Sequence, residues 1–313
     1  MGTAELACAS LNALAAAPGF QVLAVVTQPD RPKGRALKLL PSPVKEAALR
    51  AGLPVLQPER ARDAAFLEEL RRLAPDIIVV AAYGQLLPPA ILALPQRGCF
   101  NVHASLLPKY RGAAPIQWAI LNGESETGVT IMKMAEKLDT GDILAQRAAA
   151  ITAGDTAATL HERLARLGAQ LLVETLENAV NHTLAARPQS EAEATYARKI
   201  IKEDGRLDWA QPARSLWNRV RAFVPWPGAF THLPGGAPLR TVKIWRASVE
   251  ESLAVAPGAP GAVVQADKTR IVVACGEGAL RIHELQLEGG RRLTAAEFLA
   301  GHPLKTGDRL ARD

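Results

Sequence analysis

Three side chains in the middle of the chain could carry out acyl-group chemistry together: the amide of Asn101, the imidazole of His103 and the carboxylate of Asp139. An amide can donate a hydrogen bond to a developing oxyanion, an imidazole can move a proton near neutral pH, and a carboxylate can stabilise an imidazolium. No serine or cysteine in a nucleophile motif accompanies them, so the nucleophile would come from a substrate. On residue types alone, ordinary structural roles for the three remain open.

The segments around these residues predict how they are positioned. Residues 98–103 are mostly apolar and predict a short strand, in which the period of two places Asn101 and His103 on one face at the carboxyl end. Pro108 cannot continue a regular ladder, because it lacks an N–H group and restricts the residue before it. A helix is predicted over 114–121 and a strand over 127–134, and Asp139 lies in the loop that follows.

The first part of the chain has the alternation of an α/β fold. Continuous β-rich segments alternate with helix-forming segments, the strands being predicted at 21–27, 53–56 and 76–82 and the helices at 3–17, 43–51, 62–73 and 87–93. This pattern predicts a doubly wound, mostly parallel sheet, with ligands at the carboxyl ends of its strands. No G-x-G-x-x-G follows a strand, which argues against a dinucleotide cofactor.

The remainder of the chain predicts a second domain. A strand at 142–151 and a long helix at 156–182 complete a first domain of residues 1–187, and a polar, charge-rich segment at 188–205 reads as a linker. Residues 206–313 begin with a helix at 215–223. Short strands punctuated by glycine and proline follow, at 239–246, 261–266, 270–275 and 279–287. This spacing predicts a small β-barrel.

Composition narrows the class of protein. The 313 residues include 48% hydrophobic residues, no apolar run long enough for a membrane span and no signal-peptide pattern. Cys8, Cys99 and Cys275 are scattered, so we expect reduced thiols, no metal site and a cytoplasmic location. Residues 206–313 carry a net charge of +5 of the total +6. This excess suits a nucleic-acid partner, but composition alone leaves that undecided.

Several motifs around the three side chains resemble the 10-formyltetrahydrofolate-dependent formyltransferases. They are Phe100-Asn-Val-His103, Ser105-Leu-Leu-Pro108, Tyr110-Arg-Gly112, Glu126-Thr-Gly-Val-Thr130 and Leu138-Asp-Thr-Gly141. The resemblance implies that Asn101, His103 and Asp139 are catalytic, and that the second domain is OB-like. It implies 10-formyltetrahydrofolate as co-substrate, with no metal. A folate-binding wall is implied as well, built from Ser105, Leu106, Leu107, Pro108, Tyr83, Leu86 and Leu87.

The connection from residue 28 to residue 45 is long and basic. Between 30 and 45 it carries five basic residues and one acidic residue, and on charge alone it could be a solvated loop. Its Thr27-Gln-Pro-Asp-Arg-Pro32 and Leu40-Pro-Ser-Pro-Val-Lys45 segments resemble the insertion loop of the methionyl-tRNA branch of the family. The resemblance implies initiator methionyl-tRNA as partner and a monomeric protein. The residues expected to contact the tRNA are Arg31, Lys33, Arg35 and Lys38.

Three alternatives remain at this stage. A formyltransferase for an amino-sugar nucleotide shares the Ser-Leu-Leu-Pro and Tyr-Arg-Gly motifs, but that branch lacks the basic 28–45 insertion. A formyltetrahydrofolate hydrolase would have no use for such a loop. A nucleic-acid-binding protein on an inactive transferase scaffold is disfavoured by the intact Asn101, His103 and Asp139.

The first residues depart from the family pattern. Relatives begin with an apolar strand that runs into a Gly-Thr turn, and Met1-Gly2-Thr3 matches only that turn. Such a strand would be central in the sheet, and its neighbours would lose backbone pairing without it. We therefore expect an apolar strand before Met1, with a natural start about five to ten residues earlier. We also expect a gap in the sheet or a rearranged neighbour.

Overall fold

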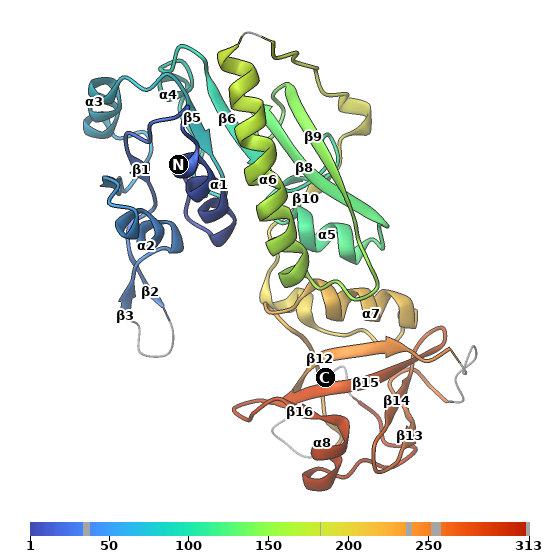
Figure 1. Ribbon diagram of the computed structural model, residues 1–313. Helices are drawn as coiled ribbons and strands as arrows, with labels where there is room; N and C mark the ends of the chain where they lie inside the picture. Colours follow the sequence, from blue (N-terminus) through green and yellow to red (C-terminus); the bar gives the residue numbers. More distant parts are fainter. Residues whose placement is uncertain (34–37, 182, 236–239, 252–257, 311–313) are drawn as a thin grey trace. The chain divides into compact units, whose positions relative to one another are not determined.

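The computed structural model describes residues 1–33, 38–181, 183–235, 240–251 and 258–310 (Figure 1). The chain forms two compact units. The first consists of Met1–Pro115, Glu126–Ala150 and Leu160–Arg198, and the second of Ile116–Ser125, Ile151–Thr159 and Lys199–Asp313.

The first unit is built on strands that pair in two sheets. Its larger sheet has the order β5-β6-β8-β9, formed by β5 (Ile78–Val80), β6 (Cys99–His103), β8 (Glu126–Lys133) and β9 (Ile143–Ala150). β5 and β6 are parallel, whereas β6, β8 and β9 are successively antiparallel. Beside this sheet, β1 (Val25–Val26) and β4 (Val55–Leu56) form a parallel pair. All five residues of β6 are buried. This is expected for a strand inside a sheet whose two faces are both covered.

Helices pack around these strands, and the sequence explains where they begin and how closely they approach. They are α1 (Glu5–Ala16), α2 (Pro43–Arg50), α3 (Ala64–Leu73), α4 (Pro89–Leu92) and α6 (Ala157–Val180). The hydroxyl of Ser42 caps α2 by accepting from the Lys45 amide at 3.0 Å. On α6, a Cβ at Gly168 would come within 3.0 Å of the Val102 side chain, so glycine lets this helix approach β6 closely.

The basic connection is more ordered than expected for a loop. Residues of β2 (Arg31–Lys33) and β3 (Lys38–Leu40) pair as an antiparallel hairpin. Two further short strands, β7 (Arg111–Gly112) and β10 (Tyr196–Ala197), pair in parallel although they lie far apart in sequence. A 3-10 helix at Glu191–Glu193 precedes β10. The segment between α6 and Arg198 is thus part of the first unit.

The second unit contains an antiparallel six-stranded sheet, consistent with the small β-barrel domain expected from the sequence. Its order is β11-β12-β15-β14-β13, with β16 paired to β15. These strands are β11 (Ala229–His232), β12 (Thr241–Val249), β13 (Val263–Ala266), β14 (Ile271–Ala274), β15 (Ala279–Leu287) and β16 (Leu293–Thr294). Its helices are α5 (Pro115–Leu121), α7 (Ala213–Ala222) and α8 (Ala295–Gly301), with a 3-10 turn at Lys202–Gly205. Trp209, Leu216 and Phe298 are buried in its core.

The first three predicted strands are shorter in the structure than in the sequence-based prediction. Of the strands predicted at 21–27, 53–56 and 76–82, the structure contains only the shorter β1, β4 and β5, respectively. The physical reason is pairing, because a strand extends only as far as a neighbour hydrogen-bonds to it. Between β1 and β5, Gly2 donates to Val26, and Met1 bonds to Val79 and Ala81. The expected gap in the sheet is therefore present.

Candidate active site

Strand β6 carries two of the three candidate catalytic side chains. Asn101 lies opposite Val80 on one side and Met132 on the other, and His103 lies opposite Thr130. Their residues are 9% and 6% exposed. Because they are two positions apart, both side chains lie on the same face of the strand, about 7 Å apart along it.

The imidazole of His103 is held in one orientation. Its Nε2 lies 2.9 Å from the carbonyl oxygen of Tyr110. A carbonyl can only accept, so Nε2 carries the hydrogen and donates it. In the neutral ring this leaves Nδ1 with a lone pair. Nδ1 lies 3.7 Å from Oδ2 of Asp139, which is close enough for the carboxylate to stabilise an imidazolium.

Asp139 is fixed by its backbone as well as by its neighbours. It has a φ of 54°, in the left-handed region that Asp tolerates better than most residues. Its Oδ2 accepts the amide hydrogen of Gly112 at 2.8 Å. Gly112 has a φ of 117°, and a Cβ there would lie 2.6 Å from the carbonyl of Ala197. Glycine is therefore required at the position that anchors this carboxylate.

The amide of Asn101 differs from the other two groups. Across the described ranges of the chain, its side chain has no hydrogen-bond partner, although it is nearly buried. The amide atoms of Asn101 are not among the fully buried, unpartnered side-chain atoms of the described residues, so they remain accessible to a ligand oxygen. Asn101 is therefore available to bind an oxygen next to His103.

The Ser105–Pro108 segment is held tightly against β8 and β9. The amide of Leu107 donates to Oγ1 of Thr130 at 3.1 Å, and its carbonyl accepts from Nε2 of Gln146 at 2.8 Å. The hydroxyl of Ser105 donates to the carbonyl of Lys109 at 2.6 Å. Leu107 is buried and Leu106 half-buried, so this segment forms a rigid apolar wall directly after β6.

A clasp formed by Arg111, Gln189 and Glu191 supports the loop that carries Asp139. Nε2 of Gln189 donates to the carbonyls of Asp139 and Gly141, at 2.9 and 2.7 Å. Its Oε1 accepts from Nε of Arg111, and Nη1 of the same guanidinium donates to Glu191 at 3.0 Å. The Arg111 residue is 0% exposed, and its hydrogen bond to Glu191 lowers the pKa of that carboxyl. Sequence reasoning assigned no role to this clasp; only Arg111 lay within a recognised motif.

The other folate-wall candidates lie in different surroundings. Tyr83 and Leu87 are part of a buried core cluster with Phe66 and Ile91, and burial raises the pKa of the Tyr83 phenol. Leu86, in contrast, is 71% exposed. The Ser105–Pro108 segment directly follows β6, whereas Tyr83 and Leu87 pack in that core cluster.

The candidate tRNA contacts belong to the β2–β3 hairpin. Arg31 is exposed, and its guanidinium donates to Oε1 of Gln28 at 3.0 Å. Lys33 and Lys38 face each other in the backbone register of the hairpin. Arg35 lies outside the described residues.

In the described ranges, no group of three or more His, Cys, Asp or Glu side chains is arranged to hold a metal ion. Of the helices described, none combines the length and the hydropathy needed to cross a bilayer.

Comparison with known proteins identifies the class. Residues 1–176 match the Formyl transferase family, and residues 199–303 match the family called Formyl transferase, C-terminal domain. The chain therefore belongs to the formyl transferase family.

Its curated relatives carry a more specific name. The methionyl-tRNA formyltransferase of Geobacter metallireducens is 49% identical over 310 residues, a match that covers 99% of this chain and 97% of that protein. The methionyl-tRNA formyltransferase of Thiobacillus denitrificans is 52% identical over 309 residues, with 99% and 97% covered.

Solved structures share the fold at lower identity. The sugar 3N-formyl transferase WlaRD aligns with a TM-score of 0.64 and 19% identity, over 93% of this chain and 96% of that one. HypX from Aquifex aeolicus, solved in complex with tetrahydrofolic acid, aligns with a TM-score of 0.58 and 22% identity, over 85% of this chain and 47% of that one. At identities of 19% and 22%, these similarities show a shared fold and nothing more specific.

Proposed function

We propose that this protein transfers the formyl group of 10-formyltetrahydrofolate to the α-amino group of methionine on initiator tRNA. The observation that carries the proposal is the arrangement of His103. Its Nε2 donates to Tyr110 and its Nδ1 faces Asp139, next to the amide of Asn101, to which no described residue hydrogen-bonds. Relatives that are 49–52% identical over nearly the whole chain are named for this reaction.

The reaction begins when the neutral amine attacks the formyl carbon. The carbonyl oxygen then becomes a tetrahedral oxyanion, and the amide of Asn101 donates to it. Because Asn101 is nearly buried, this hydrogen bond acts in a medium of low dielectric, where it is stronger than in water. A single donor of this kind contributes about 3 kcal/mol to transition-state stabilisation.

Proton movement completes the transfer. The attacking amine must lose a proton, and Nδ1 of His103 accepts it because Nε2 already carries a hydrogen. The resulting imidazolium is stabilised by the carboxylate of Asp139 at 3.7 Å. The proton then passes to N10 of the folate as the carbon–nitrogen bond breaks, which releases tetrahydrofolate and the formylated amine. His103 returns to its neutral form.

Recognition is divided between the parts of the chain. We assign formyl transfer to residues 1–187, a connecting role to 188–205 and tRNA backbone contact to 206–313, whose net charge of +5 supports this role. The apolar Ser105–Pro108 wall would face the pterin, with Tyr83, Leu86 and Leu87 as further candidates on that side.

The basic hairpin would enter the acceptor end of the tRNA through Arg31, Lys33, Arg35 and Lys38. We expect Arg35→Ala to impair the reaction with tRNA while the affinity for tetrahydrofolate stays nearly unchanged. Lower folate affinity with intact tRNA binding would reverse this assignment.

One assay tests the proposed reaction against its nearest alternative. Mass-detected formylation of charged initiator tRNA is compared with that of charged elongator tRNA and of an amino-sugar nucleotide. We expect formylation of the initiator alone. Preference for the sugar nucleotide would overturn the proposal, and the sugar enzymes among the solved structures are only 19–24% identical to this chain.

A protein with this substrate acts where translation takes place, so we infer a cytoplasmic location. We also infer a monomer, and sedimentation analysis of the purified chain checks that inference.

A further inference from the structure

One short backbone segment, Tyr110–Gly112, holds both members of the His103–Asp139 pair. The carbonyl of Tyr110 accepts from Nε2 of His103 at 2.9 Å, and the amide of Gly112 donates to Oδ2 of Asp139 at 2.8 Å. Because the groups that orient the ring and the carboxylate are two residues apart, the conformation of this segment sets how closely Nδ1 approaches Oδ2. The element that fixes Tyr110–Gly112 therefore fixes the pair.

That element is the backbone of residues 195–197. In the parallel pair β7–β10, the amide of Arg111 donates to the carbonyl of Thr195 at 2.8 Å. The amide of Ala113 donates to the carbonyl of Ala197 at 2.9 Å. Carbonyl groups accept these bonds, so they do not depend on the side chains at 195 and 197.

The hydroxyl of Thr195 adds a contact that does depend on the side chain. Its Oγ1 accepts the amide hydrogen of Tyr110 at 2.8 Å. Tyr110 has a φ of 62°, in the left-handed region that a bulky residue seldom adopts. Its amide is thus held by Thr195 and its carbonyl by His103. Together these bonds stabilise the conformation that directs the carbonyl at the imidazole.

We propose that Thr195 is a positioning residue for formyl transfer. Its hydroxyl holds the Tyr110 peptide so that the hydrogen of the neutral His103 ring stays on Nε2 and the lone pair stays on Nδ1. This inference rests on the proposed function, in which Nδ1 accepts the proton of the attacking amine. Part of the connecting segment 188–205 then contributes to the catalytic geometry as well as to the connection.

The effect of losing the hydroxyl follows from the two tautomers of the imidazole. Without this acceptor, the left-handed conformation of Tyr110 is less stable, and its carbonyl holds the ring less firmly. In the other tautomer the hydrogen is on Nδ1, which then cannot accept a proton from the amine. The rate of transfer falls with the population of the competent tautomer, although no group that contacts a substrate has been removed.

Thr195→Val tests this in the full chain, because valine keeps the β-branched shape and removes the acceptor. With charged initiator tRNA as the acceptor substrate, we expect kcat to fall about tenfold, with the KM for 10-formyltetrahydrofolate nearly unchanged. Wild-type kcat in this variant would overturn the proposal.

Two further variants separate the hydroxyl from a general effect of substitution. Thr195→Ser restores the acceptor and should restore kcat; a serine variant as slow as the valine variant would overturn the proposal. Thr183→Val is the matched control, since Thr183 is also exposed and its hydroxyl donates to the carbonyl of Asn178 at 3.3 Å. An equal loss of kcat in this control would overturn the proposal as well.

The ¹⁵N shifts of the imidazole nitrogens report the tautomer directly. The chain has six histidines, so the signals of His103 are assigned by their loss in His103→Gln. We expect the neutral ring to carry its hydrogen on Nε2 in the wild type and in Thr195→Ser, and both tautomers to be populated in Thr195→Val. A slow Thr195→Val enzyme with the wild-type tautomer would overturn the proposal, because its defect would then be structural.

The same variants separate this inference from the proposed function. Near-normal turnover by His103→Gln would remove the proton-transfer role and overturn both. A strongly impaired His103→Gln beside a fully active Thr195→Val would overturn only the role of Thr195.

Discussion

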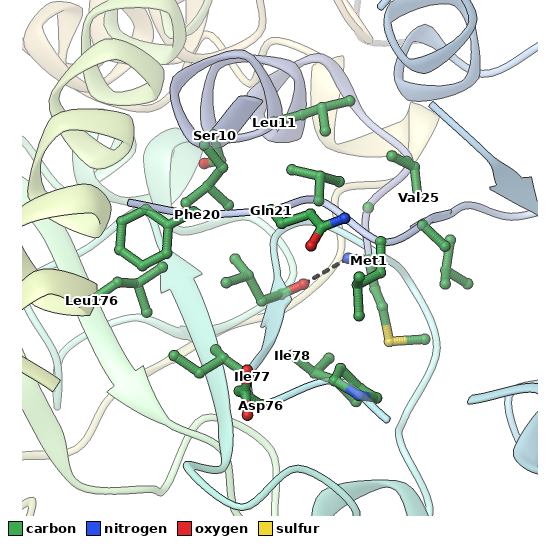
Figure 2. Close-up of a pocket in the computed structure, with 18 of the residues that line it drawn as sticks. Met1, Ser10, Leu11, Phe20, Gln21, Val25, Asp76, Ile77, Ile78 and Leu176 are labelled. Atoms are coloured by element: carbon green, nitrogen blue, oxygen red, sulfur yellow. Dashed lines mark hydrogen bonds between the residues drawn. The ribbon is translucent and has the colours of Figure 1, made fainter. Parts of the chain in front are cut away.

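The two edges of β5 differ in how they are paired and packed. On one edge β6 is fully paired, and the loops that follow it are fixed by Thr130, Gln146 and Gln189. On the other edge, backbone pairing ends at Met1, and a cavity of about 540 Å³ follows (Figure 2). The region proposed for chemistry is thus rigid, while the region next to it lacks packing. Activity and stability should therefore respond to different substitutions.

The largest effect expected on the catalytic side is that of His103→Gln. A glutamine amide can still donate to Tyr110, but it cannot accept a proton from the substrate amine. We expect kcat to fall about 10²- to 10⁴-fold, with the KM for folate nearly unchanged. Steady-state kinetics and a melting curve check this, and near-normal turnover would remove the proton-transfer role.

On the side of the cavity, pH should act through the Met1 ammonium. Its pKa is lowered to about 5 in the folded chain against an ordinary value of 8.0. The unfolded chain therefore binds more protons between pH 5 and 8, so the free energy of unfolding should rise with pH across that window, by at most ~4 kcal/mol.

Urea melts at pH 5, 6.5 and 8 measure this rise, on protein whose intact Met1 is verified by mass. The same chain acetylated at the Met1 nitrogen has no ammonium at this place and serves as the control. The same slope in both chains would show that the Met1 ammonium does not cause it.

Asn101→Ala should reduce the rate while leaving the fold intact. Because no described residue hydrogen-bonds to this amide, its removal costs the folded chain little. We expect kcat to fall about 10²- to 10³-fold, which is about 3 kcal/mol. The melting temperature should change by no more than a few degrees. A large loss of stability at normal kcat would mean that Asn101 is structural.

A smaller effect is expected for Gln189→Ala, which removes both donors that hold the Asp139 loop. Each lost hydrogen bond costs about 1 kcal/mol, and a displaced Asp139 should lower kcat about tenfold. Gln265→Ala is the matched control, since among the described residues its amide bonds only the exposed Asp267. Equal effects of the two substitutions would argue against a positioning role for Gln189.

The smallest effect concerns the hairpin. Arg31→Ala removes one exposed positive charge, so the salt dependence of tRNA binding should weaken by about one phosphate contact. Filter binding at several salt concentrations measures this slope. An unchanged slope would remove Arg31 from the tRNA contacts.

Local patterns predicted much of the fold. The leucine repeat of 156–182 became α6, and the predicted strand at 279–287 has the bounds of β15. Asn101 and His103 were placed on one face of a strand end by alternation alone. These features depend on neighbours in sequence, so the sequence is sufficient to predict them.

The features that were not predicted depend on contacts between residues far apart in the sequence. The β7–β10 pairing joins residues such as Arg111 and Tyr196, and no local pattern marks two-residue strands. The roles of Gln189 and Glu191 were missed for the same reason, because a polar segment between domains reads as a linker. The basic connection was expected to be a loop, since Pro32 and the charges conceal its short hairpin.

The Arg111 clasp has a consequence for the order in which the protein is made. Arg111 is completely buried, and its charge is balanced by Glu191, 80 positions later. While the chain emerges from the ribosome, β6 and the Asp139 loop are available long before Gln189 and Glu191. In a nascent chain that ends near residue 180, the Arg111 guanidinium lacks both its partner carboxylate and the β10 strand that pairs with it. The Asp139 loop therefore gains the hydrogen bonds from Gln189 only after residues 189–197 have been synthesised, which makes its fixation a late, long-range step of folding.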